Sequence, residues 1–410
     1  MTLLANLPRA RELMRREKVD GLIAALPINV YYLSGYWGLL MSAERFDAAF
    51  FAVLPADENE APALVLPSME LRRLVSSGGT WMDETFIYTS PDGEFDQIAV
   101  DGMPYGGWPV QPGTALTPLE QEWIAATNKQ VGRVGGNAQG ALIRAVKAAG
   151  LAGKSLVSDD ARVTDWLHQG GLENTSCRTN AGMFNTIRAV KTPAELAILR
   201  EAATINERAL RDAASAFQQG AVWEQIEIAY NASMAAAGAK GSYVICGAGG
   251  PAAGHIRRNE PMFLDALGTY RQYHGDFGRC VVVGEASALM RQRHQALCAG
   301  WEALHDLLKP GTRYSELANT AVDAIRRSGL PEFVYATPHS LGLEHTDDPK
   351  PAGSQQGMSA DVVLEAGMVI NVDMPFTEIG WGSVHIEDTV HITATGYESL
   401  TSDDFDIIEV

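Results

Sequence analysis

The second half of the sequence carries pairs of acidic residues inside apolar segments. In the segment 262–284, Asp265 and Asp276 stand at about equal distances from a turn expected near Tyr270. Partners across two strands of a hairpin lie about 5 Å apart when they share a face. We therefore expect these two carboxylates to point to one place.

A second pair follows the same pattern. Asp373 and Glu387 lie in the apolar strands expected at 368–376 and 383–393, on either side of a glycine-containing turn. A buried, unpaired carboxylate either takes up a proton or finds a cation. Two divalent cations would balance the four negative charges, so the pattern predicts a site for a pair of metal ions.

The stretch 337–345 supplies imidazole groups for such a site. His339 and His345 flank Gly342. A lone histidine is more often structural, but two histidines in a chain with four suitably placed carboxylates favour a functional role. Oxygen ligands with a single imidazole suit Mn²⁺, Co²⁺, Fe²⁺ or Zn²⁺ better than a site of thiolates. The identity of the metal stays open at this point.

The elements that must position these residues form a repeated order. Thr192-Pro193-Ala194-Glu195 is typical of a capped helix start, with proline at the first helical position and a capping box. The expected elements are helices 193–219 and 223–237, the hairpin 262–284, helices 286–308 and 315–328, and the strands 368–376 and 383–393. Two successions of helix, helix and hairpin predict a pseudo-symmetric α+β domain over 185–410.

The first part of the chain alternates helix and strand. Residues 8–18 have helical spacing, and the apolar runs 19–25, 47–54 and 63–66 are expected to form strands. This order predicts an α/β domain over 1–184. We find no catalytic cluster in it.

Composition limits the partners. The chain has 410 residues, of which 46% are hydrophobic and 20% charged, as in globular proteins, and its formal net charge is −18. Such a negative surface repels phosphate backbones and anionic lipids, so we expect neither nucleic acid nor membrane as a partner. No apolar run approaches the roughly 20 residues that span a bilayer. The N-terminus turns charged too early for a secretory signal, and the four dispersed cysteines suit a reducing cytoplasm.

Several segments together resemble one enzyme family. VDGLIAALPINVYYLSGY, AVKTPAELAILREAATI, LDALGTYRQYHGDFGRCVVVG, LEAGMVINVDMPF and VHIEDTVHIT are similar to segments of the metallopeptidase family that contains methionine aminopeptidase, prolidase, aminopeptidase P and creatinase. The resemblance covers nearly the whole chain. It implies a creatinase-type N-terminal α/β domain followed by a catalytic domain with the pita-bread fold. It also implies two divalent metal ions and a homodimer.

The resemblance assigns roles by position. Asp276 and Glu387 would bridge both metals, and Asp265 would bind the first. The full set of implied metal ligands is Asp265, Asp276, His339, Asp373 and Glu387. His255 and His345 match the two histidines near the scissile group, so they are the implied catalytic residues.

The sequence departs from the family pattern at the site. Asp373 stands where the peptidases carry glutamate and is shorter by one methylene, about 1.5 Å. His385 stands where many relatives have arginine, and Ser340 where the peptidases usually have glycine. These departures favour a substrate other than a standard proline peptide, or an unusual metal.

Three functions remain open. The resemblance implies first a hydrolase of a C–N bond, by default an Xaa-Pro dipeptidase or aminopeptidase acting on a short peptide. The second is a non-peptide reaction on a small molecule, as in creatinase or the family's dimethylsulfoniopropionate lyase. The third is a metal-free peptide-binding protein that keeps the fold without the chemistry. Turnover of Xaa-Pro dipeptides separates the first two, and metal analysis identifies the third.

Overall fold

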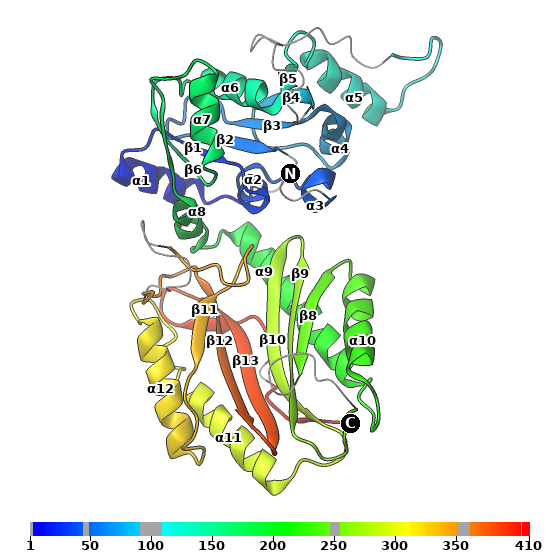
Figure 1. Ribbon diagram of the computed structural model, residues 1–410, viewed down its shortest axis with the longest axis vertical. Helices are drawn as coiled ribbons and strands as arrows, with labels where there is room; N and C mark the ends of the chain where they lie inside the picture. Colours follow the sequence, from blue (N-terminus) through cyan, green and yellow to red (C-terminus); the bar gives the residue numbers. More distant parts are fainter. Residues whose placement is uncertain (1–2, 44–48, 91–108, 247–254, 351–360, 403) are drawn as a thin grey trace. The chain divides into compact units, whose positions relative to one another are not determined.

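The protein divides into two compact units. The computed structural model describes residues 3–43, 49–90, 109–246, 255–350, 361–402 and 404–410. Unit 1 comprises Met1–Ile187 and unit 2 comprises Arg188–Val410 (Figure 1). Unit 1 is an α/β unit and unit 2 an α+β unit, which confirms the predicted fold class. The domain boundary expected between residues 184 and 185 falls within helix α8 (Ala181–Arg188) and stays a prediction.

Unit 1 is built on a mixed seven-stranded sheet with the strand order β5-β4-β3-β2-β1-β6-β7. Its strands are β1 (Gly21–Ala24), β2 (Phe51–Pro55), β3 (Ala63–Pro67), β4 (Glu84–Ser90), β5 (Gly135–Asn137), β6 (Ser155–Ser158) and β7 (Ser176–Thr179). The three strands expected from apolar runs are β1, β2 and β3. Part of the second run, residues 47 and 48, lies outside the described residues.

Helices complete unit 1. They are α1 (Leu7–Glu17), α2 (Pro27–Ser34), α3 (Leu39–Ala43), α4 (Leu71–Ser76), α5 (Pro118–Lys129), α6 (Ala138–Ala148), α7 (Arg162–Gln169) and α8, with a 3₁₀ turn at Ser68–Glu70. Helix α6 buries an apolar face formed by Ala141, Leu142, Ala145 and Val146 against the sheet. Helix α1 is the helix expected at 8–18.

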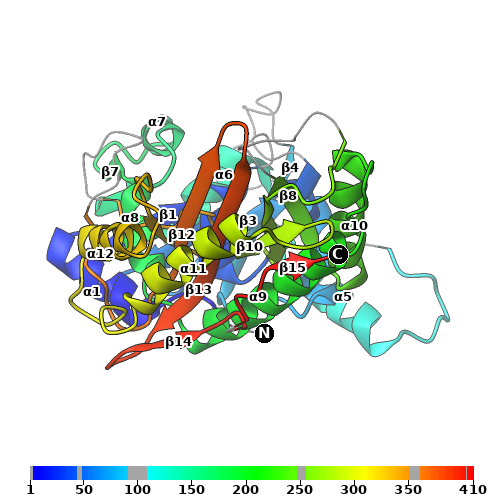
Figure 2. The same ribbon diagram turned by 90° about the horizontal axis from the view of Figure 1, so that it is seen from below.

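The described residues of unit 2 form an eight-stranded sheet and four helices. Six strands follow the order β11-β12-β13-β10-β9-β8, while β14 pairs with β13 and β15 with β10. The strands are β8 (Lys240–Cys246), β9 (Met262–Tyr270), β10 (Tyr273–Val282), β11 (Thr337–Ser340), β12 (Val369–Glu378), β13 (Gly382–Ile392), β14 (Tyr397–Ser399) and β15 (Ile408–Glu409). The helices are α9 (Pro193–Ala214), α10 (Trp223–Ala236), α11 (Ala288–Glu302) and α12 (Tyr314–Arg327). Figures 1 and 2 show α9 and α10 beside one half of the sheet and α11 and α12 beside the other.

The repeated order of unit 2 is confirmed, with one addition. Each half contains two helices, then a single strand, then a hairpin, because β8 and β11 precede the hairpins. Two helices are shorter than expected: α9 ends at Ala214 and α11 at Glu302. The residues beyond each end include buried apolar side chains, Phe217 in one case and Leu304 with Leu308 in the other. These apolar side chains reach the core from residues that follow the helices. Because they continue the apolar pattern of each helix in the sequence, the predicted helices are too long.

The first helix of unit 2 begins as its sequence predicts. The Thr192 side chain accepts a hydrogen bond from the Glu195 amide (3.2 Å), and the Glu195 carboxylate accepts one from the Thr192 amide (2.8 Å). Glu195 is buried, and its other oxygen accepts a hydrogen bond from the Tyr273 hydroxyl at 3.1 Å. The capping box therefore also fastens the start of α9 to β10.

Strand alternation separates the core face of the sheet from the polar face. Ile370, Val372 and Met374 of β12 belong to the core formed with α11 and α12. Residues between them, such as Asp373, point to the opposite face because successive side chains of a strand alternate. The same alternation in β9, β10 and β13 directs the other three carboxylates of the predicted site to this face.

The two hairpins differ in register. Asp373 lies directly opposite Glu387. Asp265, however, pairs with Gly278, and Asp276 pairs with Leu267. The two aspartates are not equally far from the turn as expected, because the turn is at Arg271–Gln272, one residue beyond the position that equal spacing requires. The two aspartates are diagonal neighbours on one face, which still brings their carboxylates close.

A buried arginine joins the two hairpins behind the site. Arg279 of β10 donates from Nη1 to the Glu387 carbonyl (3.0 Å) and from Nη2 to both oxygens of Asp388 (2.9 and 3.1 Å). Its guanidinium also lies over the Phe277 ring at 4.0 Å. Because Arg279 and Asp388 are both buried, removing either partner leaves a charge without its counter-ion.

We expect Arg279→Met to lower the free energy of unfolding of unit 2 by about 3–5 kcal/mol, the usual effect of breaking a buried ion pair. Chemical denaturation followed by tryptophan fluorescence measures this change. The matched control is Arg200→Met, which breaks the exposed pair with Glu398 and should cost at most about 1 kcal/mol. Equal effects of the two substitutions would show that Arg279 does not join the hairpins.

Candidate metal centre

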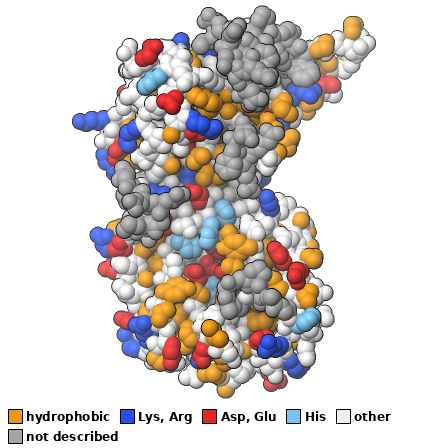
Figure 3. Space-filling view, in the orientation of Figure 1, with side chains coloured by type: hydrophobic (Ala, Val, Ile, Leu, Met, Phe, Trp, Pro, Cys, Tyr) orange, Lys and Arg blue, Asp and Glu red, His pale blue; other side chains and the backbone are white. Residues whose placement is uncertain are grey.

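Residues from five strands meet on the polar face of the unit 2 sheet. Strands β9, β10, β12 and β13 contribute one carboxylate each, and β11 contributes an imidazole. The structure brings together the five expected ligands, namely Asp265, Asp276, His339, Asp373 and Glu387. Figure 3 shows histidine and acidic side chains gathered on this part of unit 2.

One half of the cluster centres on Asp276. Its carboxylate, His339 and His345 offer ligand atoms that all lie within 4.8 Å of one another. His345 Nε2 lies 3.0 Å from Asp276 Oδ2, and His339 Nε2 lies 3.8 Å from the same oxygen. The two imidazole rings meet edge to face, with centroids 4.9 Å apart. This half therefore has one carboxylate and two nitrogen donors.

The other half centres on Glu387. Asp265, His385 and Glu387 form a second group whose ligand atoms lie within 4.8 Å of one another. Asp373 joins this half through a contact of 2.6 Å between its Oδ1 and His385 Nε2. His339 Nε2 lies 3.9 Å from Glu387 Oε1, so it faces both halves.

Neutral side chains form hydrogen bonds to Glu387 and to the backbone of Asp276. Asn371 Nδ2 donates to Glu387 Oε1 at 2.7 Å, and Thr389 Oγ1 donates to the Asp276 carbonyl at 3.1 Å. All these groups are buried. Asn371 lies on the same face as Asp373 and opposite Thr389. One network of hydrogen bonds thus links β10, β12 and β13 beneath the carboxylates.

The carboxylates perturb one another electrostatically. Burial, which outweighs the attraction of His385, raises the pKa of Asp265 to about 7. Burial together with Asp276 and Asp265 raises the pKa of Glu387 well above its usual value. Asp373 behaves differently, because the neighbouring His385 outweighs burial and lowers its pKa. A cluster with two such raised carboxyl pKa values favours any cation that can enter it.

The side chains present fit a metal pair. Asp276 Oδ1 and Glu387 Oε2 are buried and make no hydrogen bond within the part of the chain that the structure describes. Buried carboxylate oxygens normally have partners. Within the same residues, no lysine or arginine pairs with Asp265, Asp276, Asp373 or Glu387. Oxygen and imidazole donors that are directed to one place, and that no lysine or arginine neutralises in the described part of the chain, are what divalent cations bind.

The loop that carries His345 is anchored by a buried ion-pair network. Asp347 accepts hydrogen bonds from Arg188 Nη2 (2.6 Å) and from Lys191 Nζ (3.1 Å). Arg188 also donates to Glu344 at 2.6 Å. Burial alone would raise the pKa of Asp347, but the two cations outweigh it and lower that pKa. The loop is therefore fixed on both sides of His345.

His255 does not join the cluster. It is exposed, and its Nδ1 donates to the Gly220 carbonyl at 2.8 Å. Its backbone forms an isolated bridge with Val222. Its catalytic role, implied by the resemblance, stays a prediction. Of the two implied catalytic histidines, the structure places only His345 beside the carboxylates.

Two residues of the centre had no assigned role in the sequence analysis. His385 was noted as a departure from the family pattern, yet its ring lies among the carboxylates. Asn371 was not singled out. Each lies two positions before a predicted ligand, Glu387 and Asp373 respectively, and strand alternation places it on the same face. That spacing was the available signal.

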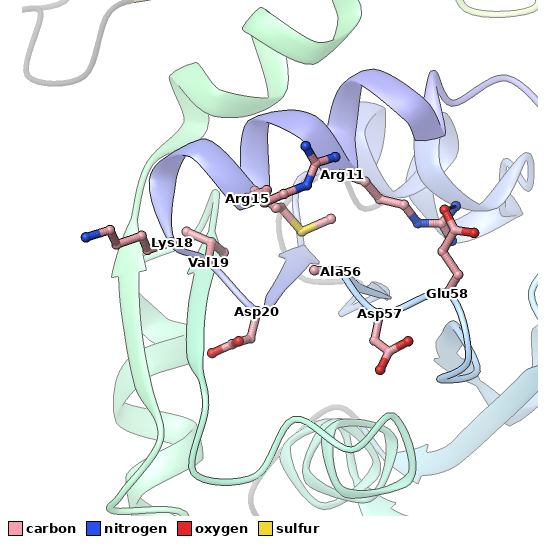
Figure 4. A pocket seen from close by; sticks show the side chains of 9 residues that line it. Arg11, Arg15, Lys18, Val19, Asp20, Ala56, Asp57 and Glu58 are labelled. Atoms are coloured by element: carbon pink, nitrogen blue, oxygen red, sulfur yellow. Dashed lines mark hydrogen bonds and ion pairs between the residues drawn. The ribbon is translucent and has the colours of Figure 1, made fainter.

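Another hollow lies in unit 1 and differs in character. Figure 4 shows Arg11 and Arg15 from α1 on one side, with Asp57 and Glu58 on the other. Arg11 pairs with Glu58 at 3.1 Å. Both groups of potential metal ligands found among the described residues lie in unit 2.

Two further structural observations concern the environment of the protein. Among the described residues, no helix combines the length and apolar character that crossing a bilayer requires. All four cysteines are free thiols, and burial raises the pKa of each of them.

Relatives with known names share parts of this sequence. It is 25% identical over 255 residues to an Xaa-Pro dipeptidase from Pyrococcus furiosus, which covers 58% of this chain and 72% of the relative. It is 31% identical over 230 residues to an Xaa-Pro dipeptidase from Lactobacillus delbrueckii subsp. lactis, which covers 52% of this chain. The match spans 60% of that relative, less than two thirds of its length.

Solved structures share the fold along nearly the whole chain. An X-Pro aminopeptidase from Thermotoga maritima superposes with a TM-score of 0.71 at 19% identity, covering 97% of this chain and all of that one. The profile described as Creatinase/Prolidase N-terminal domain matches residues 7–150. The profile described as Metallopeptidase family M24 matches residues 197–394, which include every residue of the cluster. The chain therefore belongs to the creatinase, prolidase and aminopeptidase P family of metallopeptidases, and unit 2 has the pita-bread fold of that family.

Proposed function

We propose that this protein is a hydrolase that uses two divalent metal ions to cleave a C–N bond, namely the bond before proline in a short Xaa-Pro peptide. The observation that carries the proposal is the convergence of four carboxylates, whose buried oxygens include three without a hydrogen-bond partner among the described residues. The names of the relatives, Xaa-Pro dipeptidase and X-Pro aminopeptidase, support this choice of substrate.

The ligand set of the proposed metal pair consists of the five predicted residues. Asp276 and Glu387 each stand at the centre of one half of the cluster, and His339 Nε2 lies within 3.9 Å of both carboxylates. The family resemblance supports Asp276 and Glu387 as the ligands that would be shared by the two metals. Asp265, His339 and Asp373 complete the set. Carboxylates with imidazole favour Mn²⁺, Co²⁺, Fe²⁺ or Zn²⁺. When bound, such a pair acidifies a water molecule and polarises the scissile carbonyl.

The protein's own groups bind and orient the substrate around this centre. His345 borders the cluster with 42% of its side chain exposed, so its imidazole is open to a substrate. From there it can donate a hydrogen bond to the oxygen on which negative charge develops. Asp373 is more exposed than Asp276 and Glu387, with 27% of its side chain accessible, and it suits proton transfer to the leaving nitrogen.

A second candidate function is a reaction on a small non-peptide molecule. Three departures from the peptidase pattern favour it: Asp373, Ser340 and His385. Two of them contact each other in the structure, where His385 bonds to Asp373. A change in a carboxylate that lies next to the scissile bond of the substrate alters which substrates the centre can accept.

We also propose that the enzyme is a homodimer of the reducing cytoplasm. The family resemblance supports the dimer, and the free thiols support the compartment. Size-exclusion chromatography with light scattering would identify the dimer.

The isolated protein is expected to bind two metal ions, measured by elemental analysis after dialysis against Mn²⁺ or Co²⁺. Asp276→Asn removes a charge from the buried centre and should weaken metal binding by at least about 100-fold, because the neutral amide has a single oxygen and no charge to offset a cation. Asp323→Asn, an exposed change on α12, is the matched control and should have no effect. Wild-type protein that binds no metal would identify a metal-free binding protein instead.

Metal-loaded protein is expected to hydrolyse Xaa-Pro dipeptides with a higher kcat/KM than matched Xaa-Ala dipeptides. A chelator should abolish this activity, and added metal should restore it. The assay follows the release of the free amino acids by chromatography. Silence across a broad dipeptide panel by protein that retains two metals would favour the non-peptide reaction.

His345→Ala is expected to lower kcat by about 100-fold or more, the usual effect of losing a catalytic acid, base or hydrogen-bond donor. His255→Ala should have a smaller effect, because His255 bonds to the Gly220 carbonyl and not to the cluster. Both side chains are partly or fully exposed, so neither change should prevent folding. Steady-state kinetics with equal metal content compares them, and a larger loss from His255→Ala would contradict this assignment.

A further inference from the structure

His385 occupies an unusual place in the centre. It lies on β13 two residues before Glu387 and diagonally across from Asp373, because Asp373 pairs directly with Glu387. Its Nε2 lies 2.6 Å from Asp373 Oδ1 and 3.8 Å from Glu387 Oε2. The imidazole is almost entirely buried, with 1% of the side chain exposed. A titratable side chain is thus enclosed beside two of the proposed metal ligands.

The ring of His385 lies in a slot that fits it closely. A Cβ atom built on Gly278 would lie 2.6 Å from its Cε1 and 2.7 Å from its Nδ1, so any larger residue at 278 would displace the ring. Phe263 contacts the ring edge to face, with centroids 4.8 Å apart. Glycine at 278 therefore provides the space that the imidazole occupies.

The backbone of His385 is held as well. Its amide donates to Cys280 Sγ at 3.2 Å, and the Cys280 thiol donates to its carbonyl at 3.3 Å. Contacts on the ring and on the backbone fix the direction of Nε2. That direction leads to Asp373.

Nε2 of His385 can either donate a hydrogen bond or bind a metal, but not both at once. A carboxylate oxygen only accepts hydrogen bonds, so the 2.6 Å contact requires a hydrogen on Nε2, and a nitrogen that carries a hydrogen has no lone pair for a metal. Although Nε2 lies near Asp265 and Glu387, the bond to Asp373 therefore takes precedence over ligation. It leaves the second oxygen of Asp373 for a metal. Carboxylate ligands are commonly oriented by such hydrogen bonds.

The short side chain at position 373 fits the same arrangement. Asp373 already reaches His385 at hydrogen-bond distance. Glutamate there would extend its carboxylate by about 1.5 Å toward the fixed ring. Because Gly278 makes room for the imidazole and the imidazole fills the space that a longer acid would need, the three residues suit one another.

We infer that His385 is a positioning residue that holds Oδ1 of Asp373, and that Gly278, Asp373 and His385 form a matched set which replaces a longer carboxylate at the metal centre. The inference rests on the proposed metal-dependent function. It goes further by assigning a role to a residue outside the predicted ligand set and by explaining the aspartate at position 373.

The test compares two substitutions of His385 by isothermal titration with Mn²⁺ and with Co²⁺. Leucine fills the slot but donates no hydrogen bond, and His385→Leu should weaken the weaker of the two metal-binding events by about 10- to 100-fold. Glutamine retains a donor at the position of Nε2, so His385→Gln should keep most of the affinity. His391→Gln, on the same strand but beside Glu398, is the control and should bind metal as the wild type does.

A double substitution tests the matched set. Asp373→Glu alone should bind the weaker metal less well than the wild type, because the longer carboxylate meets the imidazole. In the His385→Ala background the same change should recover affinity relative to Asp373→Glu alone, because the ring is gone. Effects of the two substitutions that simply add would overturn the matched set. Circular dichroism of each variant checks that it folds.

A spectroscopic measurement distinguishes positioning from ligation. Pulsed electron paramagnetic resonance of the Cu²⁺-loaded protein detects the imidazole nitrogens bound to the metal. The wild type and His385→Gln should show the same nitrogen couplings, and the loss of one coupling would make His385 a ligand and overturn the inference. Wild-type protein without metal would refute the proposed function, whereas equal metal affinity of the wild type and His385→Leu would refute this inference alone.

Discussion

The mutual repulsion of four carboxylates on one face of a sheet governs the structure of unit 2. Burial raises the pKa of Asp265 to about 7, and burial with two neighbouring acids raises that of Glu387. A fold gains nothing from such a cluster unless a cation enters it. The cluster therefore favours the binding of a cation. Without a cation, the surrounding structure has to hold the four carboxylates together against their mutual repulsion.

The remaining structure resists this repulsion from behind and from the side. Four helices pack on the opposite face of the sheet, where alternate strand residues form the core. Arg279 neutralises Asp388 and bonds to the backbone of Glu387, which joins β10 to β13. Arg188 and Lys191 neutralise Asp347. Buried arginine and lysine side chains thus neutralise acids next to the centre. Among the described residues, the side chains near the four carboxylates that can carry a positive charge are histidines. This division of charge leaves the carboxylates available for metal.

Two of the departures from the family pattern, Asp373 and His385, form one physical arrangement together with Gly278. Asp373, His385 and Gly278 lie on three different strands. The imidazole of His385 lies between the other two residues and is close to both. A shorter acid next to a bulky ring fills the same space as a longer acid next to a small residue. In the arrangement that we infer, the aspartate at 373 and the histidine at 385 therefore belong together, and the centre keeps four carboxylates.

The sequence by itself determined the order of the elements, the faces of the strands and four carboxylates with one imidazole. These follow from local rules: alternation within a strand, apolar spacing within a helix and the capping residues at Thr192. It could not determine features that depend on contacts distant in the sequence. Strand β11, which carries His339, forms only because it pairs with β12. The register that sets Asp265 opposite Gly278 depends on a turn of two residues. Only the tertiary structure showed that His345 lies beside the carboxylates while His255 does not, and that His385 lies beside Asp373. These contacts are between segments that are distant in the sequence and are brought together by packing.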